Sequence, residues 1–191
     1  MNRIKYKVQK VLFLGANKSE TSLIEILESR GCLVTHANKK NIDTEGYDLV
    51  ISYGYRYIIN NEIISKSPPI INLHISFLPY NKGAHPNLWS HLDGTPSGVT
   101  IHLIDKGVDT GPYLFQEEVN FDINTITFRE SYEILKNKIE IMFIKNLQLI
   151  LNLEYELHAY KTKGTYHSLS DIPKDVDWNN IISKYVQNHK A

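Results

Sequence analysis

The sequence predicts an α/β fold, in which a mostly parallel sheet carries helices on both of its faces. Three observations support this prediction. Apolar runs of strand length recur along the chain, segments with helical periodicity alternate with them, and a long helical segment follows the last run. Such an alternation of strands and helices is typical of parallel sheets with helices packed on either side.

The expected strands are short apolar runs bounded by loop or helix signals. They cover residues 10–16, 32–37, 48–53, 70–76, 98–104 and 113–119. Only a tight glycine-rich turn separates the last two runs, so we expect that end of the sheet to be mixed or antiparallel.

The expected helices show apolar residues at helical spacing or clear start and stop signals. They cover residues 21–30, 60–65, 87–92 and 127 to about 153. Gly31 ends the first helix, and Thr127 with Glu130 forms a capping box at the start of the last one. Clear periodicity is lost after Tyr160, so we expect a main domain over residues 1–161 and a tail over 162–191 that packs on it.

Charge and composition argue against several classes of protein. The 191 residues include 21 Lys and Arg against 21 Asp and Glu, so the basic excess of a nucleic-acid binder is missing. The longest apolar stretch, residues 139–153, is interrupted by polar residues and predicts a buried helix rather than a membrane span. Cys32 is the only cysteine, which fits a reducing compartment. We therefore expect a cytoplasmic protein without nucleic-acid or membrane partners.

The fourth expected strand carries polar residues where a central strand is normally apolar. Side chains alternate between the faces of a strand, so Asn72, His74 and Ser76 share one face. Three buried polar groups are costly unless each is hydrogen-bonded, and such breaks with local rules are common at functional sites.

A second group of polar residues lies in the turn Asp105 to Gly111, and Asp109 approaches His74 if the flanking strands are neighbours. An amide, an imidazole and a carboxylate suit acyl transfer. Asn72 can donate to an oxyanion, His74 can be a second donor or a proton carrier, and Asp109 can hold His74 and accept a proton. No Ser or Cys has the setting of an activated nucleophile, so direct attack by a substrate amine is the simpler chemistry. The residues alone leave a second interpretation open, in which the three are hydrogen-bonded core and turn residues.

Three stretches in order resemble the formyltransferase family: Asn72-Leu73-His74-Ile75-Ser76-Phe77-Leu78-Pro79 with Lys82-Gly83, then Gly98-Val99-Thr100, then Asp105 to Gly111. The resemblance covers roughly residues 11–153. It implies a Rossmann-like fold without a dinucleotide and makes residues 1–161 the catalytic domain. It also implies 10-formyltetrahydrofolate as formyl donor and Asn72, His74 and Asp109 as catalytic residues.

The resemblance further implies where the pterin of the folate lies. It would contact the loop after the third strand and the backbone of the 105–109 turn. The residues concerned are Tyr55, Tyr57, Ile58, Ile59, Asp105, Gly107 and Val108. No spacing of His, Cys and carboxylate residues resembles a metal site, so no metal is expected. His102 is expected to be a strand residue without a chemical role.

Family members differ in their substrates, and the chain length and the composition of the first loop help to distinguish among them. Methionyl-tRNA formyltransferases carry a further C-terminal domain and a basic surface, for which this chain has no room. Glycinamide ribonucleotide formyltransferases have a first loop rich in Gly, Ser and Asn, whereas residues 15–19 here contain one glycine, with Asn17, Lys18 and Ser19 left to bind phosphate.

The segment 79–90 looks closer to sugar N-formyltransferases, in particular to the compact type acting on a UDP-linked 4-amino-4,6-dideoxy-N-acetyl-L-altrosamine. The resemblance then implies a nucleotide-linked amino sugar as substrate. The contacts expected in this segment are Tyr80, Asn81, Lys82, Gly83 and His85. Two alternatives stay open: a phosphoribosylglycinamide formyltransferase and a non-catalytic nucleotide-sugar-binding module. The sequence does not predict an oligomeric state.

Overall fold

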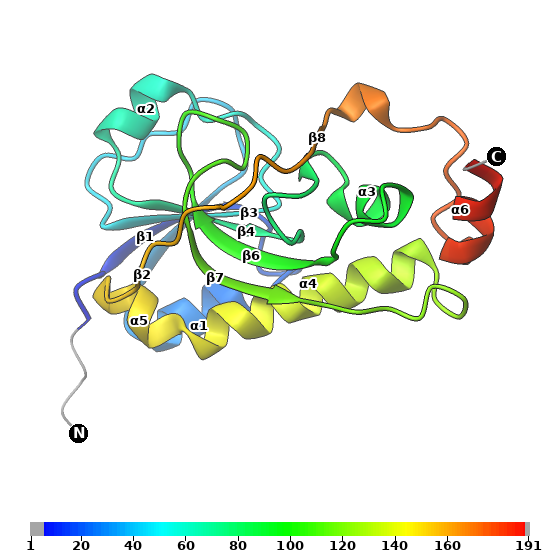
Figure 1. Cartoon of the computed structure of the whole chain (residues 1–191). Coiled ribbons are helices and arrows are strands. Elements are labelled where there is room, and N and C mark those ends of the chain that lie inside the picture. Colours follow the sequence, from blue (N-terminus) through cyan, green and yellow to red (C-terminus); the bar gives the residue numbers. More distant parts are fainter. Residues whose placement is uncertain (1–5, 190–191) are drawn as a thin grey trace.

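The computed structural model describes residues 6–189 and contains a six-stranded sheet with the strand order β2-β1-β3-β4-β6-β7 (Figure 1). The strands are β1 (Lys10–Gly15), β2 (Leu33–Ala37), β3 (Leu49–Tyr53), β4 (Ile70–His74), β6 (Gly98–Leu103) and β7 (Tyr113–Glu118). The first four are parallel, and β6 runs antiparallel to both β4 and β7. The expected mostly parallel sheet with an antiparallel end is confirmed.

The four expected helices lie close to their predicted positions, the last of them is broken in two, and a further helix in the tail was not predicted. They are α1 (Leu23–Ser29), α2 (Asn61–Lys66), α3 (Pro86–Leu92), α4 (Phe128–Lys145), α5 (Leu147–Asn152) and α6 (Ile182–His189). The capping box of Thr127 and Glu130 starts α4 as predicted. The single helix expected to reach residue 153 is wrong, because Asn146 bonds through its side chain to the Met142 carbonyl and separates α4 from α5.

Alternating residues of the strands build two apolar layers, one on each face of the sheet. Val11 and Phe13 of β1 pack with α1, α4 and α5, while Leu12 and Leu14 pack with residues of α2. Figure 1 shows α1, α4 and α5 together on one side of the sheet and α2 on the other. The side chains of β4 alternate between the two faces in the same way, and Ile71 and Leu73 lie in the apolar layer that contains α4. Asn72 and His74 consequently point to the face that carries α2.

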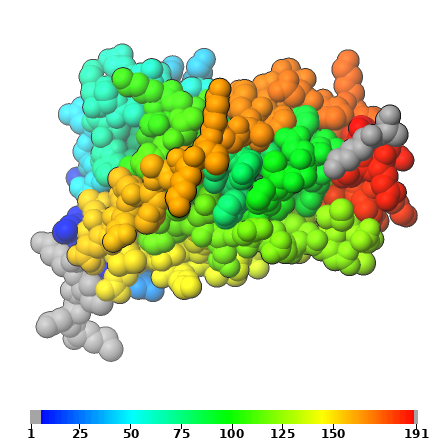
Figure 2. Space-filling model, in the orientation of Figure 1, coloured from blue at the N-terminus to red at the C-terminus, as the bar shows by residue number. Residues whose placement is uncertain are grey.

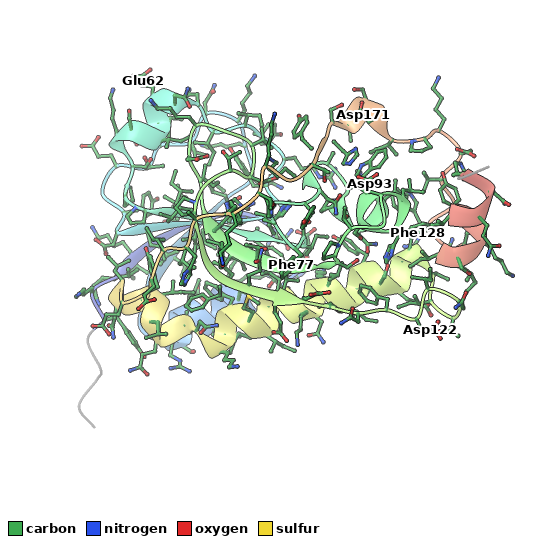
Figure 3. The ribbon with its side chains drawn as sticks, in the orientation of Figure 1. Glu62, Phe77, Asp93, Asp122, Phe128 and Asp171 are labelled. Atoms are coloured by element: carbon green, nitrogen blue, oxygen red, sulfur yellow. The ribbon has the colours of Figure 1, made fainter. Side chains whose placement is uncertain are left out.

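A third apolar cluster joins the end of the chain to the body. Phe128 of α4, labelled in Figure 3, packs with Leu88 of α3 and with Ile182 and Tyr185 of α6. Residues 162–189 also contribute β8 (Tyr166–His167), which pairs in parallel with β5 (Lys82–Gly83), and a 3-10 turn at Leu169–Asp171. The division into a domain over 1–161 and a tail over 162–191 stays a prediction, and residues 1–5 and 190–191 lie outside the described part.

The loop between β6 and β7 leaves the sheet near the start of β4. Leu103, the last residue of β6, is paired with Ile71 near the start of β4, because the two strands are antiparallel. Residues 104–112 then fold back over the sheet face that carries α2. The two ends of this loop meet at a hydrogen bond from the Leu103 amide to the Pro112 carbonyl. The polar cluster therefore lies over the sheet face rather than beyond the strand tips.

Candidate active site

Strand pairing brings three polar side chains together on the α2 face. Asn72 of β4 is paired with His102 of β6, and His74 is paired with Thr100. Paired residues of adjacent strands share a face, so Asn72 and His102 stand side by side. The Asn72 amide nitrogen lies 3.3 Å from His102 Nε2. Ser76, expected on the same face, lies beyond the end of β4 and donates through its hydroxyl to the Tyr80 carbonyl.

The loop 104–112 delivers Asp109 to this cluster by a locally fixed turn. Asp105 accepts hydrogen bonds from the Gly107 amide (3.0 Å) and the Thr110 hydroxyl (2.6 Å), which closes the turn. Gly111 packs so closely on the Leu103 carbonyl that a Cβ there would overlap it. Asp109 itself adopts a left-handed backbone conformation with φ of 50°. Such a conformation costs free energy in a residue other than glycine and is frequent at functional sites.

Both carboxylate oxygens of Asp109 face potential donors. Oδ2 accepts the Gly83 amide at 2.8 Å and lies 3.7 Å from His74 Nε2. Oδ1 lies 3.4 Å from the Asn72 amide nitrogen and 3.5 Å from His102 Nε2. The predicted meeting of Asn72, His74 and Asp109 therefore occurs, with Gly83 and His102 as further partners. The side-chain contacts are long, as is common in catalytic sites without bound substrate.

Burial and charge set opposite protonation states for the two central groups. Burial by itself raises the pKa of Asp109, but His74, His102 and the Gly83 amide together hold it well below its ordinary value. Burial lowers the pKa of His74, and the Asp109 charge and the Asn81 backbone oppose this only in part. At neutral pH the site thus holds an ionised carboxylate beside a neutral imidazole.

His74 has an unused nitrogen that faces Asp109. Its Nε2 atom is buried and has no hydrogen-bond partner among the described residues. An orphaned buried nitrogen costs free energy that a substrate or water can recover. Two surface hollows, of about 570 and 530 Å³, lie elsewhere and include none of these residues. The convergence of Asn72, His74 and His102 on the Asp109 carboxylate, rather than cavity size, locates the candidate site.

The residues predicted to bind the pterin are mostly exposed. Ile58 is 80% exposed, Tyr57 42% and Val108 38%, so their apolar surface is open to a ligand. Gly107 lies in the same turn as Val108, next to Asp105. Tyr55 is half-buried and donates its hydroxyl to the Lys39 carbonyl. Ile59 is buried among residues of the α2 layer, so it anchors the loop in the core.

The first loop, predicted to bind phosphate, uses its polar groups internally. The Lys18 ammonium pairs with Glu28 at 2.7 Å, and the Asn17 side chain accepts from the amide and hydroxyl of Ser19. The Asn17 amide donates to the Glu20 carboxylate. Few donors of this loop remain for a phosphate, and its substrate role stays a prediction.

The residues expected to contact the sugar take different places. Tyr80 and Lys82 are half-buried, and His85 is exposed and stacks on Trp178 with ring centroids 5.2 Å apart. Asn81 is fully buried, and its side-chain amide is bonded to the hydroxyls of Thr95 and Thr165. Both ends of the Asn81 amide are already used, which weighs against a side-chain contact with substrate, and its substrate role stays a prediction.

Two residues contact Asp109 in a way that the sequence did not predict, and only one had a usable signal. Gly83 was expected to contact the sugar, and that role stays a prediction. His102 was assigned no role, although it alternates with Thr100 in an apolar strand, as Asn72 and His74 do in theirs. Gly83 holds Asp109 through its backbone amide, and no side chain reveals such a contact in a sequence.

Within residues 6–189, no group of three or more His, Cys, Asp or Glu side chains is arranged to hold a metal ion. No helix in that part of the chain combines the length and apolar character needed to cross a membrane.

Comparisons with known proteins fit this geometry. Residues 9–146 match the family model of formyl transferases, and the chain belongs to this family. It is similar to the formyltransferase PseJ of Anoxybacillus kamchatkensis, with a TM-score of 0.83 and 40% identity over 92% of this chain and 96% of that one. The PseJ crystal structure holds UDP-4,6-dideoxy-4-formamido-L-AltNAc and tetrahydrofolate. The predicted resemblance to sugar N-formyltransferases is thus confirmed.

Curated relatives match over shorter parts of their length. The methionyl-tRNA formyltransferase of Thermodesulfovibrio yellowstonii is 35% identical over 152 residues, which are 76% of this chain and 47% of that protein. The dTDP-4-amino-4,6-dideoxyglucose formyltransferase of Mycobacterium tuberculosis is 40% identical over 74 residues, 39% of this chain and 31% of that protein. This chain therefore spans less than half the length of these relatives.

Replacing Asp109 tests the electrostatics of the pair. In Asp109→Asn, the pKa of His74 is expected to fall further below its ordinary 6.5, because burial remains while the attraction of the carboxylate is lost. An NMR titration of the imidazole measures this pKa. Asp122→Asn is the control, since Asp122 accepts from Asn124 and Thr125 and takes no part in the cluster. A His74 pKa that stays the same or rises in Asp109→Asn contradicts the assignment.

Proposed function

We propose that this chain transfers a formyl group from 10-formyltetrahydrofolate to the primary amine of a nucleotide-linked amino sugar. The observation that carries the proposal is the likeness to PseJ, which extends over 96% of a chain crystallised with a UDP-linked formamido sugar and a folate. A UDP-linked 4-amino-4,6-dideoxy sugar is accordingly the favoured substrate. The polar cluster supplies the groups that such an acyl transfer needs.

The amine attacks the formyl carbon directly, and no covalent intermediate with the protein forms. Asn72 donates to the oxyanion as the carbon becomes tetrahedral. Its present contacts of 3.3 and 3.4 Å are long enough to be exchanged for a shorter bond to substrate. The new carbon–nitrogen bond forms, and the bond to N10 of the folate then breaks.

One proton has to move from the attacking amine to the departing nitrogen. His74 is suited to carry it, because it is neutral and its Nε2 atom has no other partner. The imidazolium formed in this way lies beside the ionised Asp109, which stabilises it until the proton is passed on. His102 and the Gly83 amide hold Asp109 in place and keep it ionised.

The exposed apolar side chains near the cluster are proposed to receive the pterin. Tyr57, Ile58 and Val108 offer a surface suited to a flat heterocycle, with the backbone of Asp105 and Gly107 beside it. Tyr80, Lys82 and His85 are proposed for the sugar side, with Asn17, Lys18 and Ser19 as candidates for phosphate. No metal takes part. We further propose a cytoplasmic location, supported by the single cysteine, which can form no disulfide within the chain, and by charged substrates that do not cross membranes unaided.

Ligand binding can distinguish a sugar N-formyltransferase from a glycinamide ribonucleotide formyltransferase. Glycinamide ribonucleotide formyltransferases use a first loop rich in Gly, Ser and Asn, and the single glycine of residues 15–19 weighs against that substrate here. In a thermal-shift panel, UDP-linked amino sugars are expected to raise the melting temperature more than dTDP or GDP sugars and more than glycinamide ribonucleotide. A shift with glycinamide ribonucleotide alone contradicts the sugar assignment.

Replacing the central groups separates an enzyme from a binding module. His74→Ala and Asp109→Ala are each expected to lower formyl transfer by roughly 10²- to 10⁴-fold with folding intact. Folate absorbance reports turnover, and circular dichroism reports folding. His189→Ala is the control, because His189 lies on α6 and contacts Tyr185 and Asp175 rather than the cluster. A folded His74→Ala protein with near wild-type turnover removes His74 from the mechanism, and an inactive wild type favours a binding module.

A further inference from the structure

The tail beyond α5 crosses the outer surface of the molecule and runs past the loop that follows β4. Figure 2 shows it in orange, lying over green residues of the main domain. The family model ends at residue 146, so the family match assigns this segment no role. Yet β8 pairs in parallel with β5, placing Tyr166 beside Lys82 and His167 beside Gly83.

β5 has two edges, and the tail and Asp109 bind opposite ones. The Lys82 amide donates to the Thr165 carbonyl at 3.1 Å, and the Ala84 amide donates to the His167 carbonyl at 2.9 Å. Between them, the Gly83 amide donates to Asp109 Oδ2 at 2.8 Å. Successive amides of an extended segment point to opposite sides, so fixing Lys82 and Ala84 on the tail aims Gly83 at the carboxylate.

Thr165 also holds the residue that leads into β5. The Asn81 amide donates to the Thr165 hydroxyl at 2.8 Å, and this hydroxyl donates to the Asn81 side-chain oxygen at 3.2 Å. Asn81 is fully buried in a left-handed conformation with φ of 56°, which the surrounding bonds must maintain. The backbone of Asn81 lies against the His74 ring and raises its pKa.

Close packing on both sides of Thr165 keeps the tail in register. Gly164 has φ of 66° and no room for a Cβ against the Pro79 carbonyl. His167 stacks on Trp89 with ring centroids 3.9 Å apart and pairs with Asp93 at 2.7 Å. Figure 3 labels Asp93, which follows α3. The tail is thus anchored independently of Asp109.

We propose that the tail segment Gly164–His167 is a positioning element of the active site, and that the Thr165 hydroxyl is its central contact. It fixes residues 81–84 so that the Gly83 amide holds Asp109 against His74. This role rests on the proposed function, because Asp109 and His74 carry the chemistry there. Thr165 itself touches neither of the reacting groups.

The test removes the hydroxyl and then restores it. Thr165→Val keeps the shape of the side chain and is expected to lower kcat by about 10- to 100-fold, because the catalytic pair is misplaced. KM for the folate should stay within about twofold, and KM for the sugar should change less than kcat, since only Lys82 of its proposed contacts lies in the segment that Thr165 fixes. Thr165→Ser restores the hydroxyl and should bring kcat back to within about threefold of wild type. Thr127→Ala is the matched control, since it also removes a hydroxyl bonded to backbone, at the start of α4. It should leave kcat unchanged.

A second readout does not depend on turnover. The NMR signals of the His74 imidazole should move in Thr165→Val, return in Thr165→Ser and stay in place in Thr127→Ala. If Thr165→Val does not fold, Thr165→Ala replaces it in both measurements. An inactive wild type defeats the proposed function alone, and the NMR comparison still decides the role of the tail.

Three results overturn the proposal. The first is a folded Thr165→Val protein with wild-type kcat and unmoved His74 signals. The second is a rise in KM without a fall in kcat, which makes the tail a substrate contact. The third is a Thr165→Ser protein as impaired as Thr165→Val, which assigns the effect to packing rather than to the hydroxyl.

Discussion

The structure of the site depends on keeping one ionised carboxylate, that of Asp109, largely inside the protein. A buried charge is tolerated only where hydrogen bonds and opposite partial charges replace water. Here β4 supplies Asn72 and His74, β6 supplies His102, and β5 supplies the Gly83 amide. The antiparallel pairing of β6 with β4, the folded-back loop and the docked tail all serve to bring these groups to the same carboxylate.

Part of this site could be predicted from the alternation of side chains along a strand, because that alternation depends only on local geometry. Asn72 and His74 stand two residues apart in an apolar strand, so their shared face was predictable. Their meeting with Asp109 was predicted as well, but the route of the loop was not. His102 joins Asn72 only through strand register, and Gly83 acts through its backbone. Long-range register and backbone contacts leave no pattern in a single sequence.

The long helix and the tail likewise combine features that the local sequence predicts with features that it does not. Thr127 and Glu130 form a capping box that depends on four consecutive residues, and it was predictable. Asn146 ends α4 because its side chain competes for a backbone carbonyl, an outcome that helix periodicity does not reveal. Residues 162–181 lack periodicity because single contacts, such as those of Thr165 with Asn81, hold much of this segment. The following helix α6 does bury Ile182, Tyr185 and Val186 at helical spacing, a signal that the sequence analysis missed.

A crystal structure with tetrahydrofolate and the formylated nucleotide sugar tests the central claim most directly. The account predicts the formyl carbon within about 4 Å of His74 Nε2, with its oxygen in hydrogen-bonding distance of the Asn72 amide, as reacting groups held ready for transfer require. The pterin should lie against Tyr57, Ile58 and Val108. Ligands bound away from Asp109, with the His74 nitrogen still unpaired, would contradict the account.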